Sequence, residues 1–338
     1  MFGLCKRKAV AFITATALLF TGVLCSCTAP ANTDSGNVVP PAKTEEEKYF
    51  EADFIDVGEG DCCFITFPDG KTFLIDCGEE TYADNTQKLL AEKLKNEPLD
   101  YLLLTHPDAD HIGGAKNFAE RFGIRKAFLP DIKENCLSDF PLYENAYRAI
   151  INCGATTEVS QELVKIEGEN YFAAFLSPAP YSMRKSPYRD LQLNPQDATC
   201  RNDVSPVLYV ECYGRRFIFT GDCGEKQEKY VLDRYNAGVY DKAFGENRVN
   251  IDRVDVLKVS HHGASDCSSE EFLKTVACFN AIISVGGGNN YGHPSSAVIK
   301  RLAEANESCG IYRTDYYGTV SVKVAHSGEM KISTEINV

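Results

Sequence analysis

The 338-residue chain has few histidines, fewer basic than acidic residues, and no long apolar run after its first 26 residues. A helix that crosses a membrane needs about 20 apolar residues, so the rest of the chain excludes a channel or a transporter. No two cysteines have the Cys-x-x-Cys spacing, and a structural zinc knuckle is therefore not expected.

The charge balance is acidic, with 48 Asp and Glu against 35 Lys and Arg and a formal net charge of −13. Such a balance favours solubility and repels polyanions at long range. A nucleic-acid substrate would need a local basic patch, or metal ions, to offset that field. Basic residues that can offset it are Arg184, Lys185, Arg189, Arg201 and Arg313, although the same residues also fit an ordinary solvated surface.

The N-terminus has the features of a secretory leader. Residues 6–8 are Lys-Arg-Lys, and residues 9–24 form an apolar run shorter than a membrane-spanning helix. The run ends in Leu-Cys-Ser-Cys, which resembles the bacterial lipobox, whose last cysteine carries the lipid after cleavage. We therefore expect a lipoprotein signal peptide over residues 1–26 and lipidation of Cys27, because two acyl chains suffice for stable attachment. An ordinary secreted protein and an uncleaved N-terminal anchor are the alternatives.

Residues 27–47 are rich in Pro, Thr, Asn and acidic residues without periodicity, which is typical of a flexible tether. The chain as a whole has 44% hydrophobic and 25% charged residues, as globular proteins do, and no further linker follows the tether. The sequence therefore predicts one folded domain over residues 48–338. We expect it to be a monomer, extracytoplasmic and lipid-anchored to the bacterial cell membrane.

The chain contains fourteen cysteines, and those from Cys62 onward would remain after the leader is removed and Cys27 is lipidated. Their number is odd, so they cannot all be paired. We expect most of them to be small buried apolar side chains rather than a disulfide framework.

Apolar alternation and helical periodicity predict short strands mixed with amphipathic helices. Strands are expected at residues 49–57, 62–67, 72–76, 101–105, 127–129, 171–176, 206–213, 216–220, 256–259, 281–285 and 320–324. Helices are expected at residues 85–95, 114–121, 143–153, 225–235, 269–278 and 295–305. Turn residues at Pro68-Asp69-Gly70 and Gly214 indicate hairpins, and therefore antiparallel pairs inside a mixed sheet.

Four candidate metal ligands lie within six residues after an apolar strand, in the sequence THPDADHIGG. They are His106, Asp108, Asp110 and His111. A loop that leaves the carboxyl end of a buried strand is a common place for a site. Imidazole nitrogens and carboxylate oxygens together suit zinc, manganese or iron. The alternative is a polar loop whose aspartates cap the next helix, which the density of ligands disfavours.

Five of the six histidines lie in three glycine-flanked loops. Beyond the first loop, His261 and His262 follow an apolar strand in LKVSHHGAS, and His293 follows another in NNYGHPSS. One histidine at a strand end is as often structural as a ligand, but three such loops together indicate a site. Asp222 in FTGD lies between a strand and a helix, where the local pattern alone favours a helix N-cap.

These motifs resemble those of a known family. THPDADHIGG is similar to the metal-binding HxHxDH signature of the metallo-β-lactamase superfamily. FIDVGEGDCCFITFPDGKTFLIDCGE, FTGD, LKVSHHGAS, SVGGGNNYGHPSS and YRTDYYGTV resemble, in this order, the extracellular metallohydrolase domain of the ComEC competence proteins. The resemblance covers residues 49–325 and implies an α+β fold, a four-layer αββα sandwich with the site at the edge between two sheets. Together with the leader, it implies a stand-alone lipoprotein form of that domain.

The resemblance also implies two divalent metal ions and a set of ligands. His106 and Asp108 would help to bind one ion, Asp110 and His111 would bind the second, and Asp222 would bridge the two. Asp110 would in addition be catalytic, by orienting the nucleophile or accepting its proton.

The histidines of the later loops receive roles in the same way. One imidazole of the neighbouring pair would complete the second ion's ligands, and we expect it to be His261. His262 is then expected to contact the substrate, and His293 to contact a substrate phosphate at the rim of the pocket.

Two departures from the family pattern affect the first ion. Asp108 stands where most of the superfamily has His, as in ComEC-like members, and the third histidine for that ion is missing. The segment CRNDVSPVL takes its place, so Asn202, Asp203 or Ser205 are expected to line the gap, and Asn202 and Ser205 are expected to bind substrate. An oxygen-rich ligand set shifts the preference from zinc toward manganese or magnesium. We therefore expect zinc or manganese, with magnesium as a further candidate.

The resemblance implies phosphodiester hydrolysis, and we expect a phosphodiesterase or DNase at the outer face of the membrane, although the acidic charge counts against DNA. A hydrolase of a small ester, lactone or lactam is the second candidate. The missing third histidine argues against it, since zinc lactamases and lactonases usually have one. A non-catalytic binding module on a degenerate site is the third candidate, and it would bind no metal.

Overall fold

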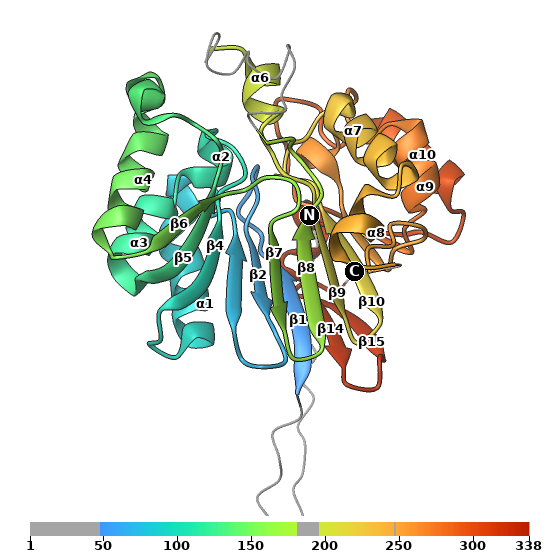
Figure 1. Ribbon diagram of the computed structural model, residues 1–338, viewed down its shortest axis with the longest axis horizontal. Coiled ribbons are helices and arrows are strands. Elements are labelled where there is room, and N and C mark those ends of the chain that lie inside the picture. The colour runs from blue at the N-terminus through green and yellow to red at the C-terminus, as the bar shows by residue number, and fades with distance from the viewer. Residues whose placement is uncertain (1–47, 181–195, 247, 338) are drawn as a thin grey trace, which may run out of the picture. The chain divides into compact units, whose positions relative to one another are not determined.

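The computed structural model describes residues 48–180, 196–246 and 248–337. These residues belong to one compact unit, Glu46–Val338. They fold into two mixed sheets, packed face to face, with helices on both outer sides (Figure 1). None of the described helices is long and apolar enough to cross a membrane.

Several expectations concern residues outside the described ranges. They are the signal peptide, the tether, the lipidation of Cys27, and the basic residues Arg184, Lys185 and Arg189. These expectations stay predictions.

The first sheet consists, in spatial order, of β15 (Met330–Thr334), β14 (Val320–Ala325), β1 (Tyr49–Phe54), β2 (Cys63–Thr66), β3 (Thr72–Ile75), β4 (Leu99–Leu103), β5 (Ile124–Leu129) and β6 (Thr156–Val159). Neighbours are antiparallel from β15 to β3 and parallel from β3 to β6. The predicted hairpin at Pro68-Asp69-Gly70 joins β2 and β3, with Gly70 in the left-handed region at φ +83°.

The second sheet consists, in spatial order, of β13 (Gly310–Arg313), β12 (Asn280–Ile283), β11 (Val256–Lys258), β10 (Arg215–Phe219), β9 (Leu208–Cys212), β8 (Tyr171–Phe175) and β7 (Lys165–Gly168). Strands β10 to β13 are parallel, and β7 to β10 are antiparallel. The loops that leave β3 and β4 of the first sheet, and β10, β11 and β12 of the second, meet at one end of the sandwich.

The helices are α1 (Ala83–Leu94), α2 (Ala109–Ile112), α3 (Ala115–Phe122), α4 (Pro141–Asn152), α6 (Ala198–Asn202), α7 (Glu225–Asn236), α8 (Val239–Phe244), α9 (Glu270–Val276), α10 (Ser296–Ala305) and α11 (Thr314–Tyr317), with 3-10 turns η1 (Glu80–Tyr82), η2 (Glu134–Asp139) and η4 (Ser260–Gly263). Apolar residues of α1, α3 and α4 pack on the outer face of the first sheet, and those of α7, α8, α9 and α10 pack on the second. The expected four-layer αββα sandwich is confirmed.

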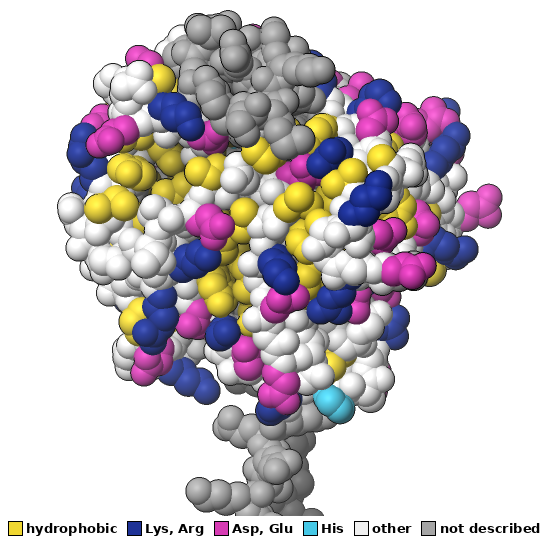
Figure 2. Space-filling view, viewed as in Figure 1, with side chains coloured by type: hydrophobic (Ala, Val, Ile, Leu, Met, Phe, Trp, Pro, Cys, Tyr) yellow, Lys and Arg dark blue, Asp and Glu magenta, His cyan; other side chains and the backbone are white. Residues whose placement is uncertain are grey.

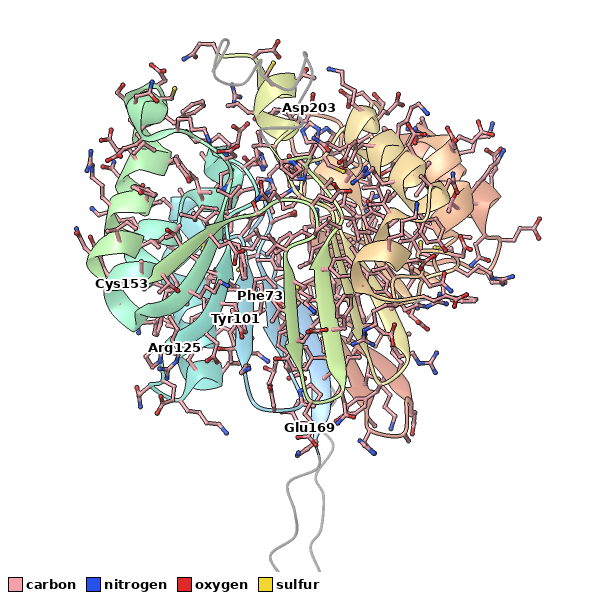
Figure 3. The ribbon with its side chains drawn as sticks, viewed as in Figure 1. Phe73, Tyr101, Arg125, Cys153, Glu169 and Asp203 are labelled. Carbon is pink, nitrogen blue, oxygen red and sulfur yellow. The ribbon has the colours of Figure 1, made fainter. Side chains whose placement is uncertain are left out.

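The core between the sheets is rich in phenylalanine. The rings of Phe50 and Phe217, from opposite sheets, have centroids 4.8 Å apart. Phe73 and Tyr101 lie in the same layer with centroids 5.9 Å apart (Figure 3). Strands such as β8 are buried on both faces, one against this core and one against helices. The strand sequence is therefore a continuous apolar run rather than an alternation.

All of the expected strands and helices are present, with ends that differ by up to three residues. The sequence patterns did not predict β6, β7, β13 and β15, which are the four edge strands of the two sheets. The structure describes eleven cysteines, from Cys62 to Cys309, and shows no disulfide among them. Seven of these are buried, as expected for small apolar side chains.

Candidate metal centre

Two glycines let the THPDADHIGG loop pack against the chain that follows β3. A Cβ atom on Gly113 would lie 2.5 Å from the backbone nitrogen of Glu80, and one on Gly114 would lie 2.6 Å from the carbonyl oxygen of Cys77. Both distances are shorter than a carbon atom permits, so this close approach requires glycine. The packing holds α2, and with it the last two ligands of the motif, at the end of the sandwich.

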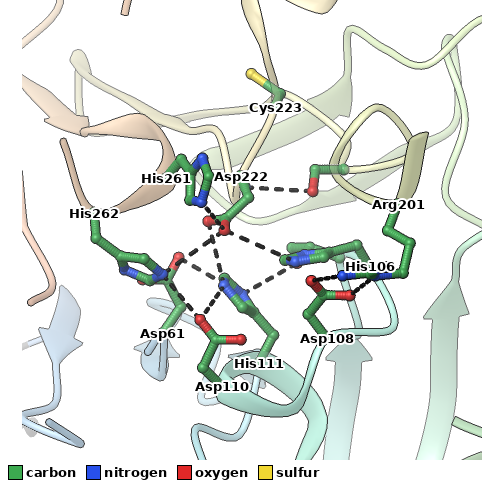
Figure 4. Close-up of polar contacts among 12 residues, drawn as sticks. Asp61, His106, Asp108, Asp110, His111, Arg201, Asp222, Cys223, His261 and His262 are labelled. Atoms are coloured by element: carbon green, nitrogen blue, oxygen red, sulfur yellow. Dashed lines mark hydrogen bonds and ion pairs between the residues drawn. The ribbon is translucent and has the colours of Figure 1, made fainter. Parts of the chain in front are cut away.

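Four side chains from three loops converge at this end (Figure 4). They are Asp110, His111, Asp222 and His262, and one ligand atom of each lies within 4.8 Å of those of the others. His111 Nε2 lies 3.2 Å from Asp222 Oδ1, and His262 Nε2 lies 3.2 Å from Asp110 Oδ2. Two imidazoles and two carboxylates at this spacing form a ligand set for a divalent cation. We call these four residues the tight cluster.

Unsatisfied polar atoms test whether a cation fits. His111 Nε2, Asp222 Oδ1 and the neighbouring His106 Nε2 are buried and have no well-aligned hydrogen-bond partner. A buried polar atom left without a partner costs about 1–3 kcal/mol. These three atoms belong to residues that surround the same end of the sandwich, and a cation bound there would give them the partner that they lack. The residues fit a metal ion.

A second layer of hydrogen bonds fixes the orientation of two imidazoles. Asp76 accepts the Nδ1–H of His111 at 2.7 Å and the hydroxyl of Thr105 at 2.7 Å. The Thr105 hydroxyl oxygen lies 3.0 Å from His106 Nδ1 and can accept its proton. In both histidines the hydrogen bond at Nδ1 leaves Nε2 to act as the ligand atom. Asp76 was not among the predicted site residues, although its position directly after a buried strand is a signal in the sequence.

Replacing Asp76 with asparagine is expected to weaken binding of a divalent cation by about 10- to 100-fold, as loss of a partner behind a metal ligand does elsewhere. One carboxylate oxygen accepts from the Thr105 hydroxyl and the His111 ring, and the other accepts the Thr105 backbone N–H at 2.8 Å, whereas an amide has only one oxygen and cannot accept at both places. Competition with a chromophoric chelator would measure the affinity, with Asp84→Asn on the exposed side of α1 as control. Equal affinities in the two variants would contradict the role of Asp76.

The structure places the two neighbouring histidines differently from the expectation. His262 is buried, its Nδ1–H donates to the Ser284 carbonyl at 2.9 Å, and its Nε2 belongs to the tight cluster. His261 is partly exposed, with Nε2 3.6 Å from Asp222 Oδ2 and Nδ1 3.7 Å from the Cys267 sulfur. The geometry therefore favours His262 over His261 as the histidine that completes the second ion's ligands, and it leaves His261 at the rim.

The backbone explains why the two histidines are placed differently. His261 and His262 both have positive φ, 48° and 51°. Non-glycine residues adopt this left-handed conformation rarely, and such strain gathers at functional sites. Two consecutive left-handed residues aim their side chains in directions that the spacing of the motif does not predict.

The part of the expected site that would bind the first ion, with His106 and Asp108, is less complete. His106 Nε2 lies 3.8 Å from Asp222 Oδ2, which agrees with a bridging position for Asp222. Asp108, however, receives two hydrogen bonds from the guanidinium of Arg201, one to each carboxylate oxygen. No group of three or more candidate ligands found among the described residues includes His106 or Asp108.

The charges of the site balance one another. Burial raises the pKa of Asp222, but His111 and His262 hold it well below the usual range. Burial lowers the pKa of His262, but Asp222 and Asp110 raise it to about 9. Burial and the nearby charge of His111 lower the pKa of His106. His106 is thus held in the neutral form that binds metals, whereas an ion entering the tight cluster would displace protons.

The pKa of Asp110 bears on its expected catalytic role. Burial raises this pKa, but His111 and a hydrogen bond from His262 outweigh it and hold the pKa below its usual range. A carboxylate with a low pKa is a good ligand and a weak proton acceptor. The electrostatics therefore favour Asp110 as a ligand that orients the nucleophile.

The expected substrate-binding residues line the surroundings of the cluster. Ser205 is buried, and its hydroxyl oxygen accepts the backbone N–H of Asp222 at 3.3 Å, so it positions that loop. Asn202 has a buried side-chain oxygen without a hydrogen-bond partner. His293 lies at the rim with its Nδ1 3.0 Å from Glu59 Oε1. The carboxylate of Glu59, which was not among the predicted site residues, fixes the orientation of this ring.

Asp203 lies beside the site rather than in it. Its carboxylate is 3.4 Å from the ammonium of Lys226 on α7, and its backbone oxygen accepts a hydrogen bond from the Gln227 amide (Figure 3). Asp203 therefore ties the segment that carries Asn202 and Ser205 to α7.

A buried ion pair missed by the sequence analysis lies behind the cluster. Lys258, in β11, is 3% exposed, and its ammonium is 2.6 Å from Asp61 Oδ2. The other oxygen of Asp61 is 3.6 Å from His262 Nδ1. Burial lowers the pKa of Lys258, but Asp61 and Asp222 outweigh it and raise the pKa, so the lysine stays charged. The positive charge behind the carboxylates offsets part of their repulsion.

Residues 55–286 match the family model described as the metallo-beta-lactamase superfamily. The αββα fold and the His/Asp cluster at its sheet edge define the same class, that of metal-dependent hydrolases. The chain belongs to the metallo-β-lactamase superfamily.

Two relatives share most of the chain. ComE operon protein 3 of Bacillus subtilis is 28% identical over 292 residues, which are 81% of this chain and 33% of that protein. Recombination protein 2 of Haemophilus influenzae is 25% identical over 256 residues, 75% of this chain and 26% of that protein. The chain thus spans a third or less of the length of these relatives. Among solved structures, the metallo-beta-lactamase fold protein YhfI from Bacillus subtilis has a TM-score of 0.45 and 11% identity, covering 84% of this chain and 100% of that one.

Proposed function

We propose that this metallohydrolase is a phosphodiesterase, with DNA or another phosphodiester as substrate and manganese or zinc as the metal. One observation carries the proposal: the guanidinium of Arg201 borders the same cavity, of about 460 Å³, as Asp108 and Asp110. Arginine binds phosphate oxygens through two parallel hydrogen bonds. A cationic fork beside a metal-binding cluster suits a substrate that carries a phosphate charge.

The chemistry divides between the metal and the chain. A bound divalent cation supplies Lewis-acid polarisation and charge neutralisation for hydrolysis. The chain positions that cation through the tight cluster and offers Arg201 to a non-bridging phosphate oxygen. A neutral ester, lactone or lactam gives Arg201 no anionic group to bind, so these substrates fit the site less well.

Aromatic and apolar side chains near the cluster suit a nucleotide. The same cavity is lined by Phe140, Pro141 and Leu142. On the rim, Tyr291 is 75% exposed and its ring stacks on that of His293 at 5.6 Å. Exposed aromatic rings beside a backbone-binding site stack on bases without regard to sequence.

The surface charge favours a short or single-stranded substrate over a long duplex. On the face in Figure 2, Lys and Arg side chains are interspersed with Asp and Glu. The basic residue Arg313 is paired with Asp315 at 2.6 Å. Long-range attraction of a polyanion is therefore weak, and binding depends on the metal ions and Arg201.

The test is a substrate panel with the full chain purified in detergent. Bis-p-nitrophenyl phosphate, single-stranded and duplex DNA, an acyl-homoserine lactone and a chromogenic β-lactam are each assayed with added Mn²⁺, Zn²⁺ or Mg²⁺. We expect hydrolysis of the diesters, strongest with Mn²⁺ or Zn²⁺, and abolition by EDTA. Turnover of the lactone or lactam without diester cleavage would overturn the proposal in favour of a small-molecule hydrolase. A protein that binds no metal and hydrolyses nothing would be a binding module.

We also propose that the protein is an extracytoplasmic lipoprotein anchored through Cys27. The positive, apolar and Leu-Cys-Ser-Cys segments of residues 1–27 support this, and two acyl chains suffice to hold a protein on a bilayer.

In a bacterium expressing the full chain, Cys27→Ser is expected to abolish incorporation of labelled palmitate and to reduce the membrane-bound fraction, because the lipidated sulfur is lost. Cys25→Ser, two residues earlier, is the matched control and is expected to leave both unchanged. Labelling that survives Cys27→Ser would contradict the anchor.

A further inference from the structure

The pairing of Arg201 with Asp108 is the unusual feature of the first half of the site. The guanidinium Nε and Nη2 donate to the two oxygens of one carboxylate, the second at 3.1 Å, across 93 residues of sequence (Figure 4). Each side chain is 23% exposed. Bidentate arginine–carboxylate pairs are stronger and more directional than ordinary ion pairs. This contact, the Arg201–Asp108 pair, therefore competes with any other partner of Asp108.

A cation at the first half of the site would have few remaining ligands. His106 Nε2 is buried, lacks a hydrogen-bond partner, and has Asp222 Oδ2 3.8 Å away. Asp108 is the next residue able to contribute, and its carboxylate is held by a positive charge that repels a cation. Two donors alone make a weak site, whereas the tight cluster has four.

The Arg201–Asp108 pair is open to an incoming anion. Both residues line the cavity of about 460 Å³ that also reaches Asp110 of the tight cluster. A phosphate entering this cavity offers the guanidinium the same two-oxygen partner that Asp108 offers. Arg201 can therefore exchange a carboxylate for a phosphate, and the exchange leaves Asp108 without its cationic partner.

We propose that the Arg201–Asp108 pair controls the second metal ion: the resting protein binds one divalent cation tightly, and a substrate phosphate that takes Arg201 releases Asp108 to join His106 and Asp222 around a second cation. This inference rests on the proposed function, because it requires a phosphate-bearing ligand. The pair makes the complete two-metal centre conditional on the presence of substrate. Arg201 thus contacts the substrate phosphate and, by releasing Asp108, also positions a ligand of the second cation.

Linkage makes the effect reciprocal. If phosphate strengthens binding of the second cation, the second cation strengthens phosphate binding by the same factor. Coupling between two sites is commonly about 5- to 150-fold. A carbonyl substrate without an anionic group, such as an acyl-homoserine lactone, would not trigger the exchange, so the pair would also discriminate against neutral lactones.

The experiment counts metal ions without using turnover. The full chain in detergent, stripped with EDTA and dialysed, is titrated with Mn²⁺ while the EPR signal of free Mn²⁺ is recorded, with and without inorganic phosphate. We expect one tight ion, a second at least about tenfold weaker, and strengthening of the second by about tenfold or more when phosphate is present. Two ions of equal affinity without phosphate would overturn the proposal.

Variants distinguish control by the Arg201–Asp108 pair from a second explanation, in which phosphate strengthens the second site by bridging the two metal ions directly. Arg201→Gln frees Asp108, so the second ion is expected to bind within about threefold of the first without phosphate, and the phosphate effect to shrink below the coupling range. Arg201→Lys keeps the charge but not the two-pronged contact, so its affinity for the second ion should lie between those of the native chain and Arg201→Gln. Asp108→Asn should lose the second ion and keep the first. An unchanged second affinity in both Arg201 variants would overturn the proposal.

Arg125→Gln is the matched control, because Arg125 is exposed and lies at the opposite end of the strands from Asp203 (Figure 3). It should titrate as the native chain does, and a loss of the second ion there would overturn the assignment to Arg201. The outcome is separable from that of the proposed function. Phosphate-dependent uptake of Mn²⁺ without diester cleavage would refute the phosphodiesterase and leave the pair's role standing. Diester cleavage by a protein that binds both Mn²⁺ ions equally well without phosphate would support the phosphodiesterase and refute the role of the pair.

Discussion

Asp222→Asn is expected to lower kcat/KM for bis-p-nitrophenyl phosphate by about a thousandfold or more, because a few kcal/mol of metal-borne stabilisation of the transition state would be lost. Asp222 is 2% exposed and faces every imidazole of the centre, with carboxylate oxygens 3.2 Å from His111 Nε2 and 3.8 Å from His106 Nε2. The neutral amide would remove the carboxylate charge from the tight cluster and from the bridging position expected for Asp222. Metal content by plasma mass spectrometry should fall together with activity.

Asp233→Asn, the same substitution on the exposed side of α7, is the control and should retain both metal and activity. Circular dichroism should show both variants folded, since the backbone N–H of Asp222 keeps its contact with Ser205. An Asp222→Asn protein with native metal content and native turnover would show that the carboxylate is not a metal ligand; the N-cap of α7 is Gly224, so capping would not be its role either.

The second large effect separates the neighbouring histidines. His262→Ala is expected to weaken binding of the tight cation by about 100-fold, whereas His261→Ala should stay within about tenfold, as for a residue outside the ligand shell. The reason is geometric: His262 Nε2 lies 3.2 Å from Asp110 and 3.7 Å from Asp222, while His261 Nε2 lies 3.6 Å from Asp222 and its Nδ1 faces Cys267, outside the tight cluster. Isothermal titration of the stripped variants with Zn²⁺ would measure both affinities.

The two variants control for each other, since both remove an imidazole from η4. If the order of the two affinities were reversed, the family-based expectation of His261 as the ligand would hold and the geometric assignment would fail. Substrate affinity adds a second readout. His261→Ala, at the rim, should change KM more than it changes metal content.

Most of the fold could be predicted because its strands are buried on one or both faces. The apolar runs of β4 and β8 carry their own signal, as do the amphipathic patterns of α4 and α7. The missed strands β6, β7, β13 and β15 are sheet edges with polar, half-exposed sequences. An edge strand pairs with only one neighbour. It forms because of the hydrogen bonds to that neighbour rather than because of its own amino-acid composition.

The candidate site also has residues that the sequence predicts and residues that only the fold brings together. His106, Asp108, Asp110 and His111 could be found because they lie on one short loop at the end of a strand, so their proximity is local. Asp222 was ambiguous on local grounds, since an aspartate before a helix is also a common N-cap. Its role depends on β10 and β4 ending at the same edge of the sandwich, which is a property of sheet topology.

The sequence by itself determined the kinds of ligand, the loop that carries most of them, and the αββα fold. Only the tertiary structure decided that His262 turns inward while His261 stays at the rim, because this follows from two consecutive left-handed residues. It also decided that Asp108 is held by Arg201 and His111 by Asp76. Contacts between residues far apart in the chain form only when the two sheets pack, and no local pattern records them.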